Sequence, residues 1–327
     1  MNSTCSLPLR TLGRSDLLVT PIGLGCWQFS HRQNLAGKFW PNLEDDLITH
    51  IVKISLEGGV NWFDTAEAYG NGASERALSK SLIASGTQPG EVIVATKWWP
   101  MFRTASNIPK TIDNRLSALS PFPIDLYQIH QPWGFSSETA EMEAMARLAR
   151  ENKIRYIGVS NFSAAKMRSA WKILQKQGIH LVSNQVRYSL LDRSIEANGI
   201  MHTAKELGIS IIAYSPLAQG MVTGKFHDQP ELMKKTGFRR YTPLFHLSGL
   251  EKTRPVVEKV RELAAKYGVT PSQVALNWLI FHHGETVVAI PGATREQHAQ
   301  ENTGAMKFKM TEEDLSQLDK ISAPFIR

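Results

Sequence analysis

The sequence predicts an α/β fold, a (β/α)8 TIM barrel with an N-terminal β-hairpin and a long loop after the seventh strand. Eight short runs of β-branched and apolar residues occur along the chain, and amphipathic segments of helical length separate them. Strands that alternate with helices form a parallel sheet, because each crossover helix must bury one face against that sheet. Eight such units are enough to close the sheet into a barrel.

The expected elements follow in order from the start of the chain. The segments LPLRTLG and SDLLV, which meet around Gly13 and Arg14, are typical of a hairpin. The eight strand runs come next: TPIGLGCW (20–27), VNWFDTA (60–66), EVIVATKWW (91–99), IDLYQIH (124–130), IRYIGVSN (154–161), HLVSNQVRY (180–188), ISIIAYSP (209–216) and TVVAIPG (286–292). Helical segments between them include EDDLITHIVKISLEGG, SERALSKSLIASG, ETAEMEAMARLARENK, AAKMRSAWKILQKQG and RPVVEKVRELAAKYG.

Residues with capping chemistry mark the expected ends of these helices. The expected N-caps are Asp45, Ser74, Ser163 and Ser272, and the expected stops are Gly58, Gly178, Gly208 and Gly268. Residues 218–250 match no unit of the repeat. A stretch of this length in a compact domain is typical of a lid or a binding loop, and a spacer without function is the alternative.

A doubly wound open sheet is the competing architecture. It predicts a glycine-rich phosphate loop directly after the first strand. The segment GLGCWQFSH lacks the third glycine of the G-x-G-x-x-G pattern. The barrel is therefore favoured, as one domain over residues 1–327.

Composition and charge limit the class of protein. The formal charge is +7 and the pI about 9.3, which fits a nucleic-acid site, a site for anionic phosphates or a basic surface without function. Lys and Arg are spread along the chain without interleaved aromatics, so a nucleic-acid partner is the least favoured. Cys5 and Cys26 are too few for a disulfide framework and show no metal-ligand spacing. With no secretory start and no apolar run of about 18 residues, we expect a cytoplasmic protein without a membrane partner.

Four polar side chains lie at or just beyond the ends of successive strand runs, where barrel active sites are built. Asp64, Lys97 and His130 end the second, third and fourth runs, and Tyr69 lies just beyond Asp64 in DTAEAYGNG. Each residue also has a structural explanation: Asp64 can cap a helix, and Tyr69 can be an ordinary loop aromatic. Lys97 and His130 can be ordinary residues of the barrel rim. Together they match the chemistry of carbonyl reduction. A phenol is a poor acid at neutral pH, so an adjacent ammonium is expected to lower its pKa, and His130 is expected to donate to the substrate oxygen.

The chain resembles the aldo-keto reductases over nearly its whole length. The motifs that carry the resemblance are NWFDTAEAYGNGASE, ATKWW, DLYQIHQP, IRYIGVSNF, NQVRYSLLDR, IAYSPLAQGMVTGKF and AIPGATREQHAQEN. The resemblance implies an NADP(H)-dependent oxidoreductase that reduces aldehydes or ketones. It also implies a catalytic tetrad, which here consists of Tyr69 as proton donor with Asp64, Lys97 and His130.

The resemblance also implies the cofactor contacts. Ser160, Asn161 and Gln185 are expected at the nicotinamide carboxamide, and Tyr214 is expected to stack on the nicotinamide ring. The residues expected at the pyrophosphate are Ser215, Leu217, Gly220 and Lys225. Those expected at the adenosine end and its 2′-phosphate are Gly292, Thr294, Arg295, His298, Glu301 and Asn302. His298 departs from the Arg or Gln frequent in the family, and its charge depends on pH.

Aromatic residues follow several strand runs and indicate an apolar or flat carbonyl substrate. Trp27, Trp98 and Trp133 are expected at the substrate pocket, with Phe29 and Trp99 nearby, and about half of these rings are expected to be core instead. The segments SHRQNLAGKFWPN and MKKTGFRRYTPLF are expected at the same mouth. Both are basic, which suits either an anionic substrate or the cofactor phosphates.

Two other readings remain. A cofactor-binding regulatory or redox-sensing subunit, as in the channel β subunits that resemble this family, carries the same motifs. A different barrel enzyme, a metal-dependent hydrolase or a phosphosugar isomerase, is less favoured, because no H-x-H motif, carboxylate cluster or strand-end Glu is found. We therefore expect no metal. The family contains monomers and larger assemblies, so a homo-oligomer is left open.

Overall fold

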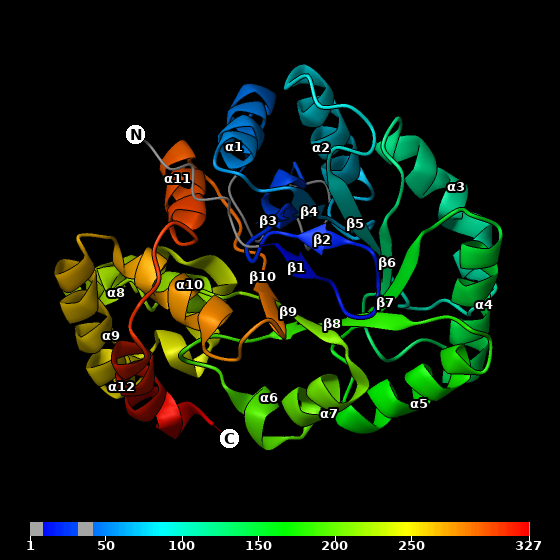
Figure 1. The fold of residues 1–327 in the computed structure, drawn as a ribbon. Helices are drawn as coiled ribbons and strands as arrows, with labels where there is room; N and C mark the ends of the chain where they lie inside the picture. Colours follow the sequence, from blue (N-terminus) through cyan, green and yellow to red (C-terminus); the bar gives the residue numbers. More distant parts are fainter. Residues whose placement is uncertain (1–8, 32–41, 327) are drawn as a thin grey trace, which may run out of the picture.

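The computed structural model describes residues 9–31 and 42–326 (Figure 1). Cys5, the first residues of the expected hairpin and most of SHRQNLAGKFWPN lie outside the described residues. Cys26 is buried and forms no disulfide among the residues described. Within the same ranges, no helix combines the length and the hydropathy that a bilayer crossing requires.

The core of the fold is a sheet of eight parallel strands whose spatial order follows the sequence. These strands are β3 (Leu24–Gly25), β4 (Trp62–Asp64), β5 (Ile93–Trp98), β6 (Leu126–Ile129), β7 (Tyr156–Ser160), β8 (Leu181–Arg187), β9 (Ser210–Tyr214) and β10 (Val287–Ala289). The first and last strands meet, because Gly23 N donates to Ala289 O at 2.9 Å and Ala289 N donates to Pro21 O at 2.8 Å. The prediction of a TIM barrel is therefore confirmed, and each of the eight predicted runs contains a strand.

The predicted hairpin is also present, formed by β1 (Arg10–Thr11) and β2 (Leu18–Val19). Figure 1 shows it lying across the ring of strands. Its side chains Leu12, Leu17 and Val19 pack with residues from the early positions of several strands, including Trp62 and Leu126. The hairpin therefore fills the barrel at the amino-terminal ends of the strands and leaves the carboxyl ends for a site.

Gly13 is the residue that allows this close approach. It adopts φ +57, and a Cβ atom there would lie 2.2 Å from the carbonyl oxygen of Val182. A side chain at this position would therefore combine backbone strain with a clash against the strand it covers.

Helices surround the barrel (Figure 1). They are α1 (Asp45–Glu57), α2 (Ala73–Ala84), α3 (Asn107–Leu119), α4 (Glu138–Arg150), α5 (Ala164–Gln175), α6 (Ser194–Ala197), α7 (Ile200–Leu207), α8 (Lys225–Asp228), α9 (Leu247–Tyr267), α10 (Pro271–Phe281), α11 (Glu296–Gly304) and α12 (Glu312–Ser322). Gly58, Gly208 and Gly268 end helices as predicted, whereas Gly178 lies beyond the C-cap Lys176 of α5.

Only one of the four predicted N-caps lies at its expected place. Ser163 accepts a hydrogen bond from Lys166 N and caps α5. Asp45 is the first residue of α1, and Ser74 lies inside α2. Thr270 rather than Ser272 is the N-cap of α10, because Thr270 and Gln273 form a capping box with Pro271 at the first helical position.

The long segment after β9, the seventh barrel strand, is built from short helical turns. They are Ala218–Gly220, α8, Pro230–Lys235, Gly237–Tyr241 and Pro243–Phe245. Buried apolar side chains hold the segment, with the rings of Phe226 and Phe245 in edge contact at 5.2 Å. The helix that follows begins at Leu247, earlier than the predicted RPVVEKVRELAAKYG, so the predicted boundary was wrong there.

Candidate active site

The four residues of the predicted tetrad lie at the carboxyl ends of neighbouring strands. Asp64 is the last residue of β4, Lys97 lies one residue before the end of β5, and His130 directly follows β6. Tyr69 lies in the turn between β4 and α2. Since these strands are adjacent and parallel, the barrel brings residues far apart in the sequence to one mouth.

Lys97 is the centre of this group. Its ammonium nitrogen Nζ lies 2.5 Å from Asp64 Oδ2, 2.9 Å from the carbonyl oxygen of Thr65 and 3.5 Å from the hydroxyl Oη of Tyr69. The side chains of Lys97 and Asp64 are 0% and 2% exposed. Two amides also donate to Asp64 Oδ1, Gln185 Nε2 at 2.8 Å and Gln128 Nε2 at 3.0 Å.

Burial sets the protonation of the phenol. It raises the pKa of Tyr69 well above 10, and the negative potential of Asp64 raises it further. The pKa of the phenol is therefore raised, where a lowered pKa was expected, because burial dominates. Burial also lowers the pKa of Lys97, against the opposing effect of Asp64. At neutral pH Tyr69 therefore carries its proton and is an O–H donor.

His130 packs edge-on against two rings. Its centroid lies 5.6 Å from that of Tyr69 and 5.0 Å from that of Trp99. Burial lowers the pKa of His130 well below 6.5, and the charge of Lys97 acts in the same direction. Its Nδ1 atom is buried and has no hydrogen-bond partner within the described residues. The imidazole is therefore neutral, and one of its ring nitrogens has no partner among the described residues.

The residues expected at the carboxamide lie beside the tetrad. Asn161, at φ +60, accepts a hydrogen bond from Tyr214 Oη at 3.0 Å and donates to Ser160 Oγ at 3.1 Å. Ser160 Oγ in turn donates to the carbonyl oxygen of Gln185 at 2.9 Å. These four residues lie at or near the carboxyl ends of β7, β8 and β9, where amide, hydroxyl and aromatic groups come together.

The residues expected at the pyrophosphate follow β9. Ser215 has φ +51, and Gly220 has φ +89. A Cβ atom on Gly220 would lie 3.1 Å from Lys225 Nζ, so the ammonium covers this turn. Leu217 is half-buried between them. The segment thus combines a turn with two left-handed backbone positions and one positive charge, which suits an anion.

The residues expected at the adenosine end surround the start of α11. Arg295 occupies the N-cap position, and Thr294 Oγ1 lies 3.2 Å from His298 Nδ1. Burial lowers the pKa of His298, and the charges of Arg295 and Lys225 lower it further, against the opposing effect of Glu301. Asn302 Nδ2 donates to Gly292 O at 3.5 Å, closing the turn before the helix.

The predicted substrate residues divide into mouth and core. The ring of Trp27 stacks on Tyr69 with centroids 5.9 Å apart. Trp133 is 44% exposed, and its ring centroid lies 5.4 Å from that of Trp99. Trp98 does not border the mouth. It is fully buried and donates through Nε1 to Asn107 Oδ1 of α3 at 3.0 Å, because it points away from the side on which Lys97 lies. Trp99 is the half-buried ring that contacts His130.

Two polar residues near the site were absent from the predicted set. Gln128 is a fully buried amide on β6 that donates to Asp64. Glu67 lies between Asp64 and Tyr69 in the sequence, and this acidic residue is 5% exposed. The signal for Gln128 was a polar residue inside the apolar run IDLYQIH. No spacing in the sequence points to the role of Glu67.

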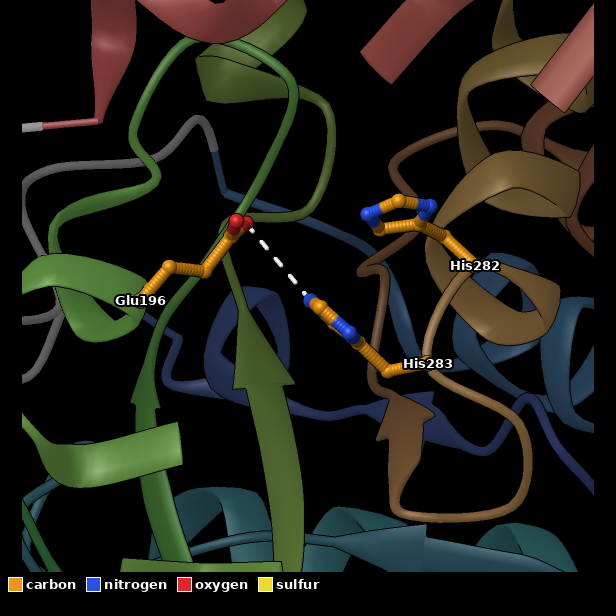
Figure 2. A group of neighbouring side chains, drawn as sticks. All are labelled: Glu196, His282 and His283. Carbon is orange, nitrogen blue, oxygen red and sulfur yellow. Dashed lines mark ion pairs between the residues drawn. The ribbon is translucent and has the colours of Figure 1, made fainter. Parts of the chain in front are cut away.

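The described residues also contain a group with donor atoms suited to a metal, formed by Glu196, His282 and His283 (Figure 2). The Glu196 carboxylate already accepts hydrogen bonds from Tyr188 Oη at 2.6 Å and from Arg193 Nε at 2.8 Å. The Arg193 guanidinium is buried and also contacts Ser322 at the end of α12. A buried cation beside these donors opposes a metal ion, and the cluster links the loop after β8 to the C-terminal helix.

Comparisons with known proteins agree with this architecture. The model described as "Aldo/keto reductase family" matches residues 21–323. The chain is 33% identical to a chloroplastic pyridoxal reductase of Arabidopsis thaliana, over 95% of this chain and 86% of that protein. Its fold matches a glycerol dehydrogenase of Gluconobacter oxydans (TM-score 0.84, 26% identity, 97% and 96% of the two chains covered). It also matches an aldo/keto reductase of Klebsiella pneumoniae in complex with NADP and acetate (TM-score 0.72, 25% identity, 96% and 95% covered). With the family match covering most of its length, the chain belongs to the aldo/keto reductases.

Proposed function

We propose that the protein reduces aldehydes or ketones to alcohols with NADPH, and that Tyr69 donates the proton to the carbonyl oxygen. The observation that carries the proposal is the buried pair of Asp64 and Lys97, whose ammonium lies 3.5 Å from the Tyr69 hydroxyl. As Tyr69 loses its proton, the negative charge on its oxygen develops next to this ammonium. A fixed charge placed where charge develops stabilises a transition state without reorganisation.

The residues present fit a nicotinamide dinucleotide. The amides of Asn161 and Gln185 have the donors and acceptors that a carboxamide requires. Lys225 and the turn at Gly220 suit the pyrophosphate, and Arg295 at the start of α11 suits a 2′-phosphate. When bound, the reduced nicotinamide supplies the hydride.

This chain's own residues hold and move the proton. The carbonyl oxygen of a substrate is expected between Tyr69 Oη and the neutral imidazole of His130, whose buried ring nitrogen lacks a partner within the described part of the chain. His130 donates a hydrogen bond to that oxygen, and Tyr69 transfers its proton. The exposed ring of Trp133 and the half-buried rings of Trp27 and Trp99 favour a flat or apolar carbonyl compound.

The test is NADPH oxidation over a panel of aldehydes, ketones and sugars that includes pyridoxal, run with the wild type and Tyr69→Phe. We expect turnover by the wild type and its loss in Tyr69→Phe, while NADPH binding, followed by fluorescence, persists. Full turnover by Tyr69→Phe would exclude the phenol as the acid. Tight cofactor binding with no turnover of any carbonyl compound by the wild type would instead favour a regulatory subunit.

A further inference from the structure

A buried network of charged side chains lies directly behind the proposed tetrad. Glu67 Oε1 lies 2.6 Å from Arg103 Nη1, and Glu67 Oε2 lies 2.6 Å from Arg115 Nη1. Arg115 Nε lies 2.9 Å from Glu75 Oε2. The side chains of Glu67, Glu75 and Arg115 are 6%, 0% and 10% exposed. The proposed chemistry uses none of them.

Glu67 connects the two segments that carry Tyr69 and Lys97. Its carboxylate accepts a hydrogen bond from the backbone amide of Trp99 at 2.5 Å, two residues after Lys97. Its own backbone N–H donates to Lys97 O at 3.3 Å, and its carbonyl accepts from Gly72 N at 2.9 Å, closing the turn that contains Tyr69. One residue therefore holds the tyrosine turn against the end of β5.

Glu75 extends the same connection to the other side of Lys97. Its carboxylate accepts a hydrogen bond from the Thr96 hydroxyl at 2.6 Å, one residue before Lys97. Arg115 on α3 then bridges Glu75 on α2 to Glu67 in the turn. The residues on both sides of Lys97 are thus held by one set of buried carboxylates. A Cβ atom on Gly72 would lie 3.1 Å from Arg115 Nη2, so the turn packs directly onto the guanidinium.

Burying Glu67, Glu75 and Arg115 is costly, and a network that served stability alone could be replaced by apolar packing. Its position suits a geometric role. We propose that Glu67, supported by Arg115, is a positioning residue that fixes the turn of Tyr69 against the strand of Lys97 and so sets the distance between the phenol and the ammonium. This inference rests on the proposed reduction, since the rate of that reaction depends on the distance between Tyr69 Oη and Lys97 Nζ.

The test compares Glu67→Gln with Asp125→Asn. Asp125 is a matched control, because its buried carboxylate also accepts from a backbone amide of β5, Val94 N at 2.9 Å, and from a guanidinium, Arg155 Nη1 at 2.7 Å. It lies at the opposite end of the strand from Lys97. We expect Glu67→Gln to lower kcat by about 10- to 100-fold with KM and the Kd for NADPH within about twofold of wild type. Asp125→Asn should leave kcat unchanged. Equal losses of kcat in the two variants, or an unchanged kcat in Glu67→Gln, would overturn the proposal.

Arg115 offers a rescue test. Arg115→Met removes the charge that holds Glu67, and Arg115→Lys retains it, so we expect Lys to recover much of the kcat that Met loses. Hydrogen exchange of the peptides covering 65–72 and 97–103 gives a readout that needs no turnover, and it should be faster in Glu67→Gln and Arg115→Met. Unchanged exchange in these peptides would contradict the positioning role, whether or not the wild type reduces a carbonyl compound. Absence of turnover by the wild type would refute only the proposed function.

Discussion

The ammonium of Lys97 lies 2.5 Å from the carboxylate of Asp64, and both side chains are buried inside the barrel mouth. Removing one partner leaves the other as an unpaired buried charge. We expect Asp64→Asn and Lys97→Met each to lower the free energy of unfolding by about 3 kcal/mol or more. The double variant should lose clearly less than the sum of the two, because it buries no charge. Urea unfolding of the wild type, the two single variants and the double variant gives a double-mutant cycle. Strictly additive losses of stability would show that the pair is not coupled.

Two glutamines donate to the same oxygen of Asp64, and we expect their substitution to have different effects on NADPH binding. Gln185 Nε2 lies 2.8 Å from Oδ1 and Gln128 Nε2 lies at 3.0 Å, and both residues are buried. Only Gln185 belongs to the set proposed for the carboxamide. We expect Gln185→Leu to weaken NADPH binding about tenfold, the value of about one lost hydrogen bond to a polar ligand. Gln128→Leu should leave binding unchanged and lower kcat. Titration of NADPH fluorescence checks this, and equal Kd values for the two variants would contradict the assignment of Gln185.

The sequence was informative about the barrel because parallel strands buried on both faces are continuous apolar runs, and eight of them are easily counted. The gathering of Asp64, Lys97 and His130 followed from that count, since the carboxyl ends of neighbouring parallel strands share one face. The orientation of Trp98 could not be predicted in the same way. Whether Trp98 or Trp99 borders the mouth depends on which residues of β5 point into the barrel, because successive side chains alternate and a shift of one position exchanges the two rings.

The contacts that support the tetrad were harder to predict for a different reason. Arg115 meets Glu67 from a position 48 residues away, and it is buried where α3 packs against α2, a contact that no local pattern reveals. The direction of the Tyr69 pKa shift also depends on how deeply the phenol is buried. The presence of Lys97 in the sequence does not predict that burial. Such properties arise from tertiary packing, so they become visible only when the helices are placed around the barrel.

Cofactor preference is predicted to depend on Arg295. Arg295 is the N-cap of α11, where backbone amides and the helix dipole favour an anion, and the neutral His298 lies one turn later. A 2′-phosphate is present in NADPH and absent from NADH. We expect Arg295→Ala to raise the Kd for NADPH about tenfold or more, with a change for NADH of less than about twofold. Equal losses for the two cofactors would count against a 2′-phosphate contact at this residue.

The neighbouring rings Trp98 and Trp99 should respond to substitution in opposite ways. Trp98 is fully buried, so Trp98→Ala is expected to cost about 3–5 kcal/mol of stability through the cavity it leaves. Trp99 is half-buried and contacts both His130 and Trp133. We expect Trp99→Ala to cost much less stability and to raise KM for aromatic aldehydes more than for small aliphatic ones. Thermal unfolding and a KM series measure the two effects, and a stability loss in Trp99→Ala as large as in Trp98→Ala would refute the division.

Glu75 should make stability depend on pH in a defined window. Burial raises the pKa of Glu75 from 4.5 to about 7, against the opposing effect of Arg115. Between these two values the folded chain holds a proton that the unfolded chain has released, so raising the pH through this window lowers the free energy of unfolding. The full contribution is about 3 kcal/mol, at 1.36 kcal/mol per pKa unit.

Glu75→Gln cannot ionise and should lack this dependence. We expect the stability of the wild type to fall relative to Glu75→Gln as the pH rises from 4.5 to about 7, and the difference to stay constant above that range. Glu143→Gln on α4 is a suitable control, because Glu143 is exposed and its removal takes away one carboxyl without changing the buried network. Denaturant unfolding at a series of pH values measures all three proteins. Parallel stability curves for the wild type and Glu75→Gln would show that Glu75 is ionised throughout, and that Arg115 compensates its burial fully.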